Sequence, residues 1–501
     1  MASNIALELC KGLYTWTSVA VIAVSLFYIW WRRPHNFPPG PRGLPLIGVL
    51  PFLGRFPGEV FKKWSLEYGP VMSIRMGRSD VVVVNTGDSF REAFVEQGAN
   101  TSGRPPDIMF AQVTGDKGLV FKDYSANFKA TKKWILRTLS QYGLGRRGME
   151  EKIQEEADCL AGYLRTKVGK PVDFKLSLYC LTSNVVSLIM SGRRYDYEDE
   201  EHQKRLELIH LIFGDPNDAP KLLLIDLFPA LKYLPVFKTA NDKLRSRMKA
   251  VLGFTRSNIE EHKKTFEKDD IRDFIDTFLA EMKFGNETSR DNFTEDELNV
   301  LFRDFFLAGS ETTSTNILWI LLLLVHYPEH TAKVIKEIDT IIGPNASASS
   351  TTHSSQMPFT CAFIQESMRY RTSVPLGAQH YCQKTFQLNG YTIPKGTLIY
   401  PNIWGVHNDP KSWPNPSKFD PYRHIDEKGN YRNSSNVIPF LIGPRNCVGE
   451  ALARQEIFIF LVKILQKFEV KPVPGKTPSI ADGVNSVVFS PHSFNLILQE
   501  R

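Results

Sequence analysis

The stretch Phe440-Leu-Ile-Gly443-Pro-Arg445-Asn-Cys447-Val-Gly449, near the carboxyl end of a 501-residue chain, decides the fold. It holds one cysteine between two glycines, with an arginine two residues before the sulfur. A thiolate is a metal ligand, and glycine lets the backbone pass close to a flat partner. A lone cysteine in a turn is usually a buried structural residue. The complete F-x-x-G-x-R-x-C-x-G pattern instead favours a loop whose cysteine ligates a metal.

A second motif, Ala308-Gly309-Ser310-Glu311-Thr312-Thr313, lies within a long apolar segment. Thr294-Glu-Asp-Glu297 is a capping box, which predicts a helix beginning there and ending before Pro328. Two small residues let a flat group approach this helix, and the acid beside a hydroxyl can relay protons in an apolar cavity. Taken alone, the motif is more typical of a packing site with a solvated glutamate.

A third pattern combines Glu366-Ser-Met-Arg369 with Phe419-Asp-Pro421-Tyr-Arg423. An acid and a base three residues apart usually form a surface pair on a helix. The second segment, which ends in Arg423, follows about 50 residues later and adds a further base.

The first 33 residues predict a membrane anchor. Residues 12–31 are uncharged and apolar, a length of about 20 residues that spans a bilayer as a helix. Arg32 and Arg33 follow directly, so the positive-inside rule places the body in the cytosol. A cleaved signal peptide fits less well because no small-residue cleavage site precedes Pro34. The proline-rich residues 34–50 predict a stiff hinge.

Composition limits the remaining possibilities. The net charge of +7 suits a membrane surface or an acidic protein partner, whereas the absence of an arginine-rich block argues against nucleic acid. The six cysteines show no close pairing, which indicates a reducing compartment.

We expect a hairpin over 71–84, helices over most of 87–370, and strands again over 387–400. The fold is therefore predicted to be mainly α with a small β region, as one domain over 51–501.

Together the motifs resemble the cytochrome P450 family, and the chain resembles its microsomal family 2 type. The stretch Gly390-Tyr-Thr-Ile-Pro-Lys-Gly-Thr-Leu-Ile399 is similar to the fatty-acid-hydroxylating subfamily U. The resemblance implies the cytochrome P450 fold, haem b ligated by Cys447, and an acid–alcohol pair of Glu311 and Thr312. It also implies that haem is contacted by Phe440, Gly443, Gly449, Arg445, Trp134, Arg104, His380 and Ala308, and that Phe306, Val374 and Leu376 form an apolar substrate wall. The family pattern further implies a buried ionic triad of Glu366, Arg369 and Arg423. Removing one member of such a triad leaves an uncompensated charge and costs about 3–5 kcal/mol.

The implied function is a monooxygenase of the endoplasmic reticulum membrane. It would insert one atom of O2 into a fatty acid, steroid or xenobiotic, with electrons from NADPH through cytochrome P450 reductase and with cytochrome b5 as a further donor. Two alternatives stay open: a peroxide-rearranging isomerase that needs no reductase, and a haem-binding sensor without turnover. The intact Glu311-Thr312 pair argues against the isomerase.

One helix departs from the family pattern. Members commonly carry an arginine four residues after the Trp134 position, where this chain has Thr138, with Arg137 one residue earlier. One residue rotates a side chain by about 100° around a helix, so we do not expect Arg137 to bind the same haem propionate. Lys129, Lys132 and Lys133 share a face of this helix, and the resemblance implies that they dock an acidic electron donor.

Overall fold

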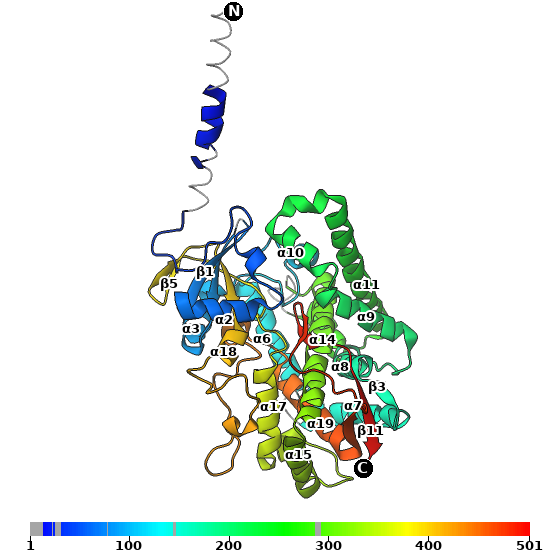
Figure 1. Cartoon of the computed structure of the whole chain (residues 1–501). Coiled ribbons are helices and arrows are strands. Elements are labelled where there is room, and N and C mark those ends of the chain that lie inside the picture. The colour runs from blue at the N-terminus through cyan, green and yellow to red at the C-terminus, as the bar shows by residue number, and fades with distance from the viewer. Residues whose placement is uncertain (1–13, 23, 26–31, 78, 144–146, 286–291) are drawn as a thin grey trace, which may run out of the picture.

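The computed structural model describes the chain except residues 1–13, 23, 26–31, 78, 144–146 and 286–291. Figure 1 shows a large helical body with a smaller β-rich part beside it, near the N-terminal segment. The longest helices, α11 (Pro235–Thr265) and α14 (Glu295–His326), belong to the helical part. The predicted architecture, mainly α with small β regions, is confirmed.

The elements have the following bounds. The other α-helices are α2 (Pro57–Tyr68), α3 (Gly87–Arg91), α4 (Gly98–Thr101), α5 (Met109–Thr114), α6 (Ala126–Gln141), α7 (Arg147–Arg165), α8 (Lys175–Ser191), α9 (Glu200–Gly214), α10 (Ala219–Leu227), α12 (Phe274–Phe284), α15 (Pro328–Ile341), α16 (Ser350–His353), α17 (Pro358–Tyr370), α18 (Ile403–His407) and α19 (Glu450–Lys467). The short 3₁₀ or π turns are η1 (Leu50–Phe52), η2 (Glu92–Glu96), η3 (Pro229–Tyr233), η4 (Ser354–Gln356), η5 (Pro421–His424) and η6 (Gly443–Arg445). The strands are β1 (Val71–Met76), β2 (Ser79–Val84), β3 (Pro171–Asp173), β4 (His380–Tyr381), β5 (Phe386–Leu388), β6 (Tyr391–Ile393), β7 (Leu398–Pro401), β8 (Phe468–Pro472), β9 (Gly483–Asn485), β10 (Phe489–Pro491) and β11 (Asn495–Glu500).

The main sheet has the strand order β1-β2-β7-β4. Strands β1 and β2 form the predicted hairpin, with Val71 opposite Val84 and Met76 opposite Ser79. Strand β2 contributes a run of buried valines, a residue type that suits a pleated, covered surface, and it pairs in parallel with β7. Strand β7 lies between β2 and β4. The sheet therefore places residues near 80 on one side of residues near 400 and His380 of β4 on the other side.

Helix α14 is the central element of the helical part. Thr294 caps it by accepting a hydrogen bond from the Glu297 backbone N–H at 3.2 Å. The Glu297 side chain does not complete a capping box but pairs with Lys122 at 2.8 Å. Among the described residues α14 alone is long and apolar enough to cross a bilayer, yet 72% of its most apolar window is buried inside the protein. It is therefore a core helix, packed mainly against α8.

The proline-rich hinge is attached to the sheet. The Ser73 backbone N–H donates to the Pro39 carbonyl at 2.8 Å, and its hydroxyl donates to the Pro38 carbonyl at 2.6 Å. Gly40 has φ +156°, and a Cβ there would lie 1.9 Å from the Ser73 carbonyl oxygen. This close approach requires glycine and fixes where the chain enters the body.

The predicted membrane anchor lies largely outside the described residues. Residues 14–22 are helical and their side chains are exposed. Figure 1 shows this segment standing apart from the body on the side of β1. The division into an anchor (1–33), a hinge (34–50) and one domain (51–501) stays a prediction.

Candidate functional site

The cysteine loop is held by its own backbone. The Cys447 N–H donates to the Phe440 carbonyl at 2.9 Å, which closes the loop before α19. Gly443 has φ +81°, and a Cβ there would lie 1.7 Å from the Phe94 carbonyl oxygen. Gly443 is thus required by both its conformation and its surroundings. The loop's shape is set by contact with η2 rather than by the cysteine itself.

The Cys447 sulfur lies in a setting that suits a metal ligand. Burial raises the pKa of its thiol, while the backbone N–H of Gly449 hydrogen bonds to the sulfur and opposes that rise. A side chain at position 449 would meet this sulfur, since a Cβ would lie 3.9 Å from it. Amide donors to a ligating sulfur adjust its donor strength. The side chain of Cys447 is nevertheless accessible at the surface of the loop.

Arg445 and Arg104 form a buried cationic cluster with His380. The Arg445 guanidinium donates to the Ser102 and Lys122 carbonyls, at 2.8 and 2.6 Å. Arg104 donates to the carbonyls of Val120 and Gln379, at 2.8 Å each. Burial lowers the pKa of both guanidinium groups, that of Arg445 to about 10.

This cluster fits the anionic edge of a haem. Among the described residues no carboxylate lies within ion-pair distance of either guanidinium. The Asp123 carboxylate accepts from the Arg104 backbone N–H and acts on both guanidinium groups only at longer range. His380 bonds the Thr101 carbonyl through Nδ1 at 2.8 Å, and its buried Nε2 has no partner within the described part of the chain. Buried cations normally have an anionic partner. Two haem propionates would supply it, and the residues present therefore fit the cofactor.

Helix α14 presents a partly accessible stripe within its buried surface. Ala308 is exposed, and Phe305, Thr312 and Asn316 are partly exposed, whereas most other residues of the helix are buried. These positions recur every three to four residues and therefore share one face. The Thr312 hydroxyl donates to the Ala308 carbonyl at 2.7 Å. A small accessible residue beside a hydroxyl suits the approach of a flat macrocycle.

Two sequence-based assignments on this helix need correction. A Cβ at Gly309 would lie 2.6 Å from Cγ2 of Val186, so this glycine permits close packing of α14 against α8 and does not open a groove. Phe306 is completely buried, and its ring lies 5.2 Å from the ring of Phe254 on α11. Two residues rotate a side chain by about 200°, so Phe306 points away from Ala308. Phe306 is therefore not part of a substrate wall beside the stripe.

The other two predicted wall residues are placed differently. Val374 and Leu376 lie in the segment between α17 and β4 and are both partly exposed. Leu376 packs against the hydrophobic cluster beneath the main sheet, which includes Tyr400. Their participation in a substrate pocket stays a prediction.

Glu311 is buried and bonded on the side of α8 and α9. One carboxylate oxygen accepts a hydrogen bond from the Tyr179 hydroxyl at 2.8 Å and lies 3.1 Å from Nδ1 of His210. The motif in the sequence identified Glu311 as a candidate acid. Its partners Tyr179 and His210 could not be identified in this way, because neither belongs to a local motif. Glu311 is thus buried against α8 and α9, whereas Thr312, the next residue, lies on the partly accessible stripe with Ala308.

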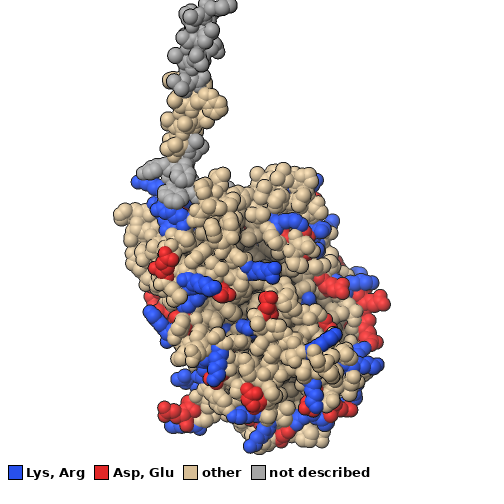
Figure 2. Space-filling model, in the orientation of Figure 1, with Lys and Arg blue, Asp and Glu red and all other residues tan. Residues whose placement is uncertain are grey.

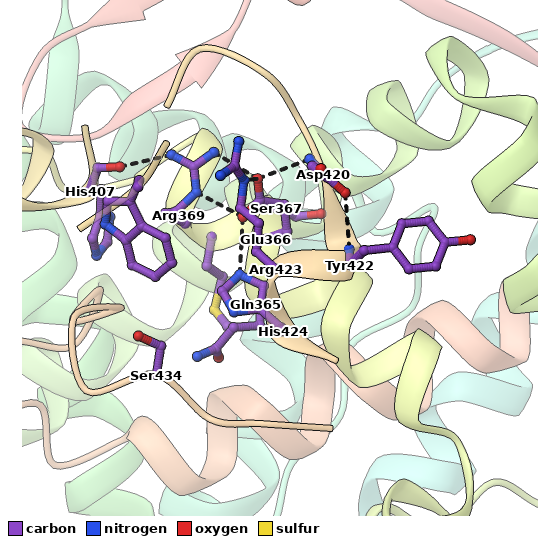
Figure 3. Close-up of polar contacts among 12 residues, drawn as sticks. Gln365, Glu366, Ser367, Arg369, His407, Asp420, Tyr422, Arg423, His424 and Ser434 are labelled. Carbon is purple, nitrogen blue, oxygen red and sulfur yellow. Dashed lines mark hydrogen bonds and ion pairs between the residues drawn. The ribbon is translucent and has the colours of Figure 1, made fainter. Parts of the chain in front are cut away.

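The predicted ionic triad is assembled (Figure 3). Arg369 forms a bidentate pair with Glu366, both contacts being 2.7 Å, and the two side chains are fully buried. Arg423 contributes its charge at 3.5 Å from Glu366, although its hydrogen bonds go to the carbonyls of Pro414 and Asn415. Burial raises the pKa of Glu366, but the bonds from Arg369 and His424 outweigh it and lower the pKa below its ordinary value.

His424 is a fourth member that the sequence pattern did not include. Its Nε2 lies 3.0 Å from Glu366, and its ring is fully buried. Tyr422, two residues earlier, is 45% exposed, and Figure 3 shows its ring directed away from Glu366. Tyr422 is therefore not part of this ion cluster, whereas His424 is.

Helix α6 faces the cysteine loop with one lysine. Lys132 donates to the carbonyls of Pro444 and Asn446, at 2.8 and 3.1 Å. Burial, followed by the charge of Arg445, lowers its pKa to about 8. Lys132 is partly exposed and positions the loop, and its part in docking an electron donor stays a prediction.

The remaining predicted contacts of α6 are less direct. Trp134 is partly buried among the rings of Phe274, Phe278 and Phe293, with centroids 4.8 to 5.5 Å away. Arg137 is exposed and Thr138 is buried, as expected from the shifted arginine. A contact between Trp134 and a haem propionate stays a prediction.

Taken together, the helical fold, the cysteine loop and the buried cations define a haem-thiolate protein. The family model described as Cytochrome P450 matches residues 38–498. The chain therefore belongs to the cytochrome P450 family, whose members bind haem b through a cysteine thiolate.

Individual relatives agree with this assignment over nearly their whole length. The chain is 36% identical to rabbit (Oryctolagus cuniculus) cytochrome P450 2C3 over 95% of this chain and 96% of the relative. It is 34% identical to cytochrome P450 2C20 of Macaca fascicularis, over 95% and 98%, and 33% identical to human (Homo sapiens) cytochrome P450 2C8, over 94% and 96%. The chain is a microsomal family 2 type monooxygenase, and its likeness to subfamily U stays a prediction.

Proposed function

We propose that the protein is a microsomal monooxygenase that inserts one atom of O2 into a lipophilic substrate, with electrons from NADPH delivered by a separate reductase. The observation that carries this proposal is the site itself. Cys447, with an amide on its sulfur, the buried Arg104–Arg445–His380 cluster and the accessible Ala308–Thr312 stripe together suit one flat, anionic, iron-bearing cofactor.

Each group has a defined role in this proposal. Haem bound through Cys447 supplies oxygen activation, which thiolate donation favours. Arg445, Arg104 and His380 bind the propionates, while Phe440, Gly443 and Gly449 shape the loop. Ala308 is exposed and would leave space for a flat group, and the Thr312 hydroxyl holds a proton at Oγ1 beside the Ala308 carbonyl. The Glu366–Arg369 pair, with Arg423 and His424, supports the region beneath the loop and does no chemistry.

The proposed substrate is an apolar molecule such as a fatty acid, a steroid or a xenobiotic. Phe305 replaces Phe306 as the expected wall residue on α14, because it lies on the same face as Ala308 and Thr312. Val374 and Leu376 would complete the wall from the segment before β4. No described feature selects among the three classes.

Membrane association is supported by apolar side chains on the body. Leu46 and Phe52 are 72% and 51% exposed near η1, and Tyr233 and Val236 are 75% and 63% exposed near the start of α11. In Figure 1 the N-terminal segment and α10 lie at the same end of the molecule, and Figure 2 shows that this end carries extensive uncharged surface. Single-pass anchoring in the endoplasmic reticulum, with the body in the cytosol, would place these side chains at the membrane.

Reconstitution with purified reductase and NADPH tests the proposal. Under ¹⁸O2, a monooxygenase places one labelled atom in the product and the other in water. An isomerase forms product without the reductase, and a non-catalytic sensor consumes no NADPH beyond the reductase alone. Labelled product that requires both NADPH and the reductase is the expected result, and either of the other patterns would overturn it.

A further inference from the structure

A chain of polar groups connects the solvent to the interior face of α14. Lys175 on α8 lies 2.9 Å from Nε2 of His210 on α9, and Nδ1 of His210 lies 3.1 Å from the Glu311 carboxylate on α14. Accessibility falls along this path: the His210 side chain is 26% exposed and that of Glu311 is 1% exposed. The chain therefore begins at the surface and ends at the buried carboxylate of Glu311, one residue before Thr312 in the sequence of α14.

The donors and acceptors give this chain a direction. A lysine ammonium can only donate, so Nε2 of His210 accepts. The ring proton then resides on Nδ1, which lies 3.1 Å from the Glu311 carboxylate and 3.3 Å from the Tyr179 hydroxyl. An imidazole that accepts at one nitrogen and donates at the other can pass a proton between its two sides. The ring is thus arranged to receive from Lys175 or water and to deliver to Glu311.

Glu311 has features that a purely structural carboxylate does not need. One oxygen accepts from Tyr179 and faces His210, whereas Oε2 is buried without a hydrogen-bond partner in the described part of the chain. A buried polar atom without a partner costs free energy, so its retention calls for an explanation. An oxygen that must take up and release a proton provides one.

We propose that Lys175, His210 and Glu311 form the proton-entry route of this enzyme. The proposal rests on the monooxygenase function argued above. Nε2 of His210 takes a proton from Lys175 or a water, Nδ1 passes its own proton to Glu311, and Glu311 releases a proton toward the Thr312 hydroxyl. Each transfer moves one proton and no electrons. Tyr179 is a positioning residue that holds the carboxylate.

His210→Gln tests the route in the full-length holoenzyme reconstituted with reductase. We expect an unchanged carbon monoxide difference spectrum and continued NADPH consumption. The product formed per NADPH should fall several-fold, hydrogen peroxide release should rise, and the solvent isotope effect of D2O on product formation should change. Wild-type product yield and an unchanged isotope effect in this variant would overturn the route. A failure of the proposed monooxygenase function can be distinguished from a failure of the route, because in that case the wild-type enzyme itself would form no labelled product.

His492→Gln is the matched control. It makes the same substitution at an exposed histidine outside the route, so its product yield and isotope effect should match those of the wild type. An equal loss in both variants would overturn the proposal.

A second readout does not depend on turnover. Imidazole ¹⁵N shifts of ¹⁵N-histidine-labelled protein in its diamagnetic carbon monoxide complex report the tautomer, with His210→Gln assigning the resonance. The route requires the proton on Nδ1 of His210. A proton on Nε2 alone would contradict it.

Discussion

His424 donates to Glu366 across 3.0 Å, and both side chains are completely inaccessible to solvent. This bond adds an imidazole to the pair that Glu366 forms with Arg369. A carboxylate at this depth is stable only when its oxygens are bonded, so His424 is an integral part of the buried cluster around Glu366.

Replacing His424 with leucine should therefore destabilise the protein. Leucine keeps a similar volume but removes the donor, which leaves one acceptor position of Glu366 unmatched. We expect a loss of about 1–3 kcal/mol in the free energy of unfolding, measured with urea. Tyr422→Phe, at an exposed neighbour of the same turn, should change it by less than about 0.5 kcal/mol. Equal effects in the two variants would show that His424 has no special role.

His407 makes the folded state sensitive to acid. Burial, with the charges of Arg369 and His424, lowers its pKa from 6.5 to about 3. Its neutral ring bonds the Thr372 hydroxyl and accepts from the Ile438 N–H at 2.8 Å. Because only the unfolded chain binds the proton between these pKa values, this contribution is complete above pH 6.5 and is lost as the pH falls toward 3.

The loss should amount to about 1.4 kcal/mol per pH unit in that window. Urea unfolding measured at several pH values gives the slope. His407→Gln should reduce the slope, whereas His492→Gln, at an exposed histidine, should leave it unchanged. An unaltered slope in the His407 variant would contradict the assignment.

Gly309 and Gly253 provide a matched pair of helical glycines. Gly309→Ala forces a methyl group against Val186, and we expect destabilisation of about 1–3 kcal/mol. Gly253 in α11 has open space, so Gly253→Ala should be neutral or stabilising by up to about 1 kcal/mol. Thermal unfolding measures both.

The added substitution Val186→Ala tests the cause. It should recover part of the stability lost in Gly309→Ala if the clash with α8 is responsible. No recovery would indicate that Gly309 serves another purpose on α14.

Electron delivery should depend on Lys133 rather than on Lys132. Lys133 is exposed on α6, and Lys132 is committed to the cysteine loop. Lys133→Glu should slow reduction of the haem by the reductase, and the difference should shrink as salt is added. Stopped-flow reduction measures the rate. Lys63→Glu, at an exposed lysine on α2, is the control. An equal effect in this variant would contradict the assignment of Lys133 to a docking face for the reductase.

The sequence was informative where a motif specifies its own geometry. The cysteine loop, the hairpin of β1 and β2, and the Glu366–Arg369 pair follow from local spacing, turn residues and caps. The first helical turn of α14 was also predicted, from the capping residue Thr294.

The sequence was less informative where tertiary contacts decide. Helix α14 is buried on nearly all sides, so its periodicity does not tell which side faces a cofactor. Phe306 was chosen where the structure favours Phe305. His424, Lys132 and His210 gained their roles from elements far away in the chain. Such partners become visible only when the helices are packed.

The carbon monoxide difference spectrum of the reduced protein tests the central claim, that Cys447 ligates haem iron. It should be recorded for the detergent-solubilised wild type, for Cys447→Ser and for Cys361→Ser, which alters another cysteine. We predict a strongly red-shifted Soret band in the wild type and in Cys361→Ser, and its loss in Cys447→Ser. A folded, haem-supplemented wild type without this band, or a Cys447→Ser variant that keeps it, would contradict the account.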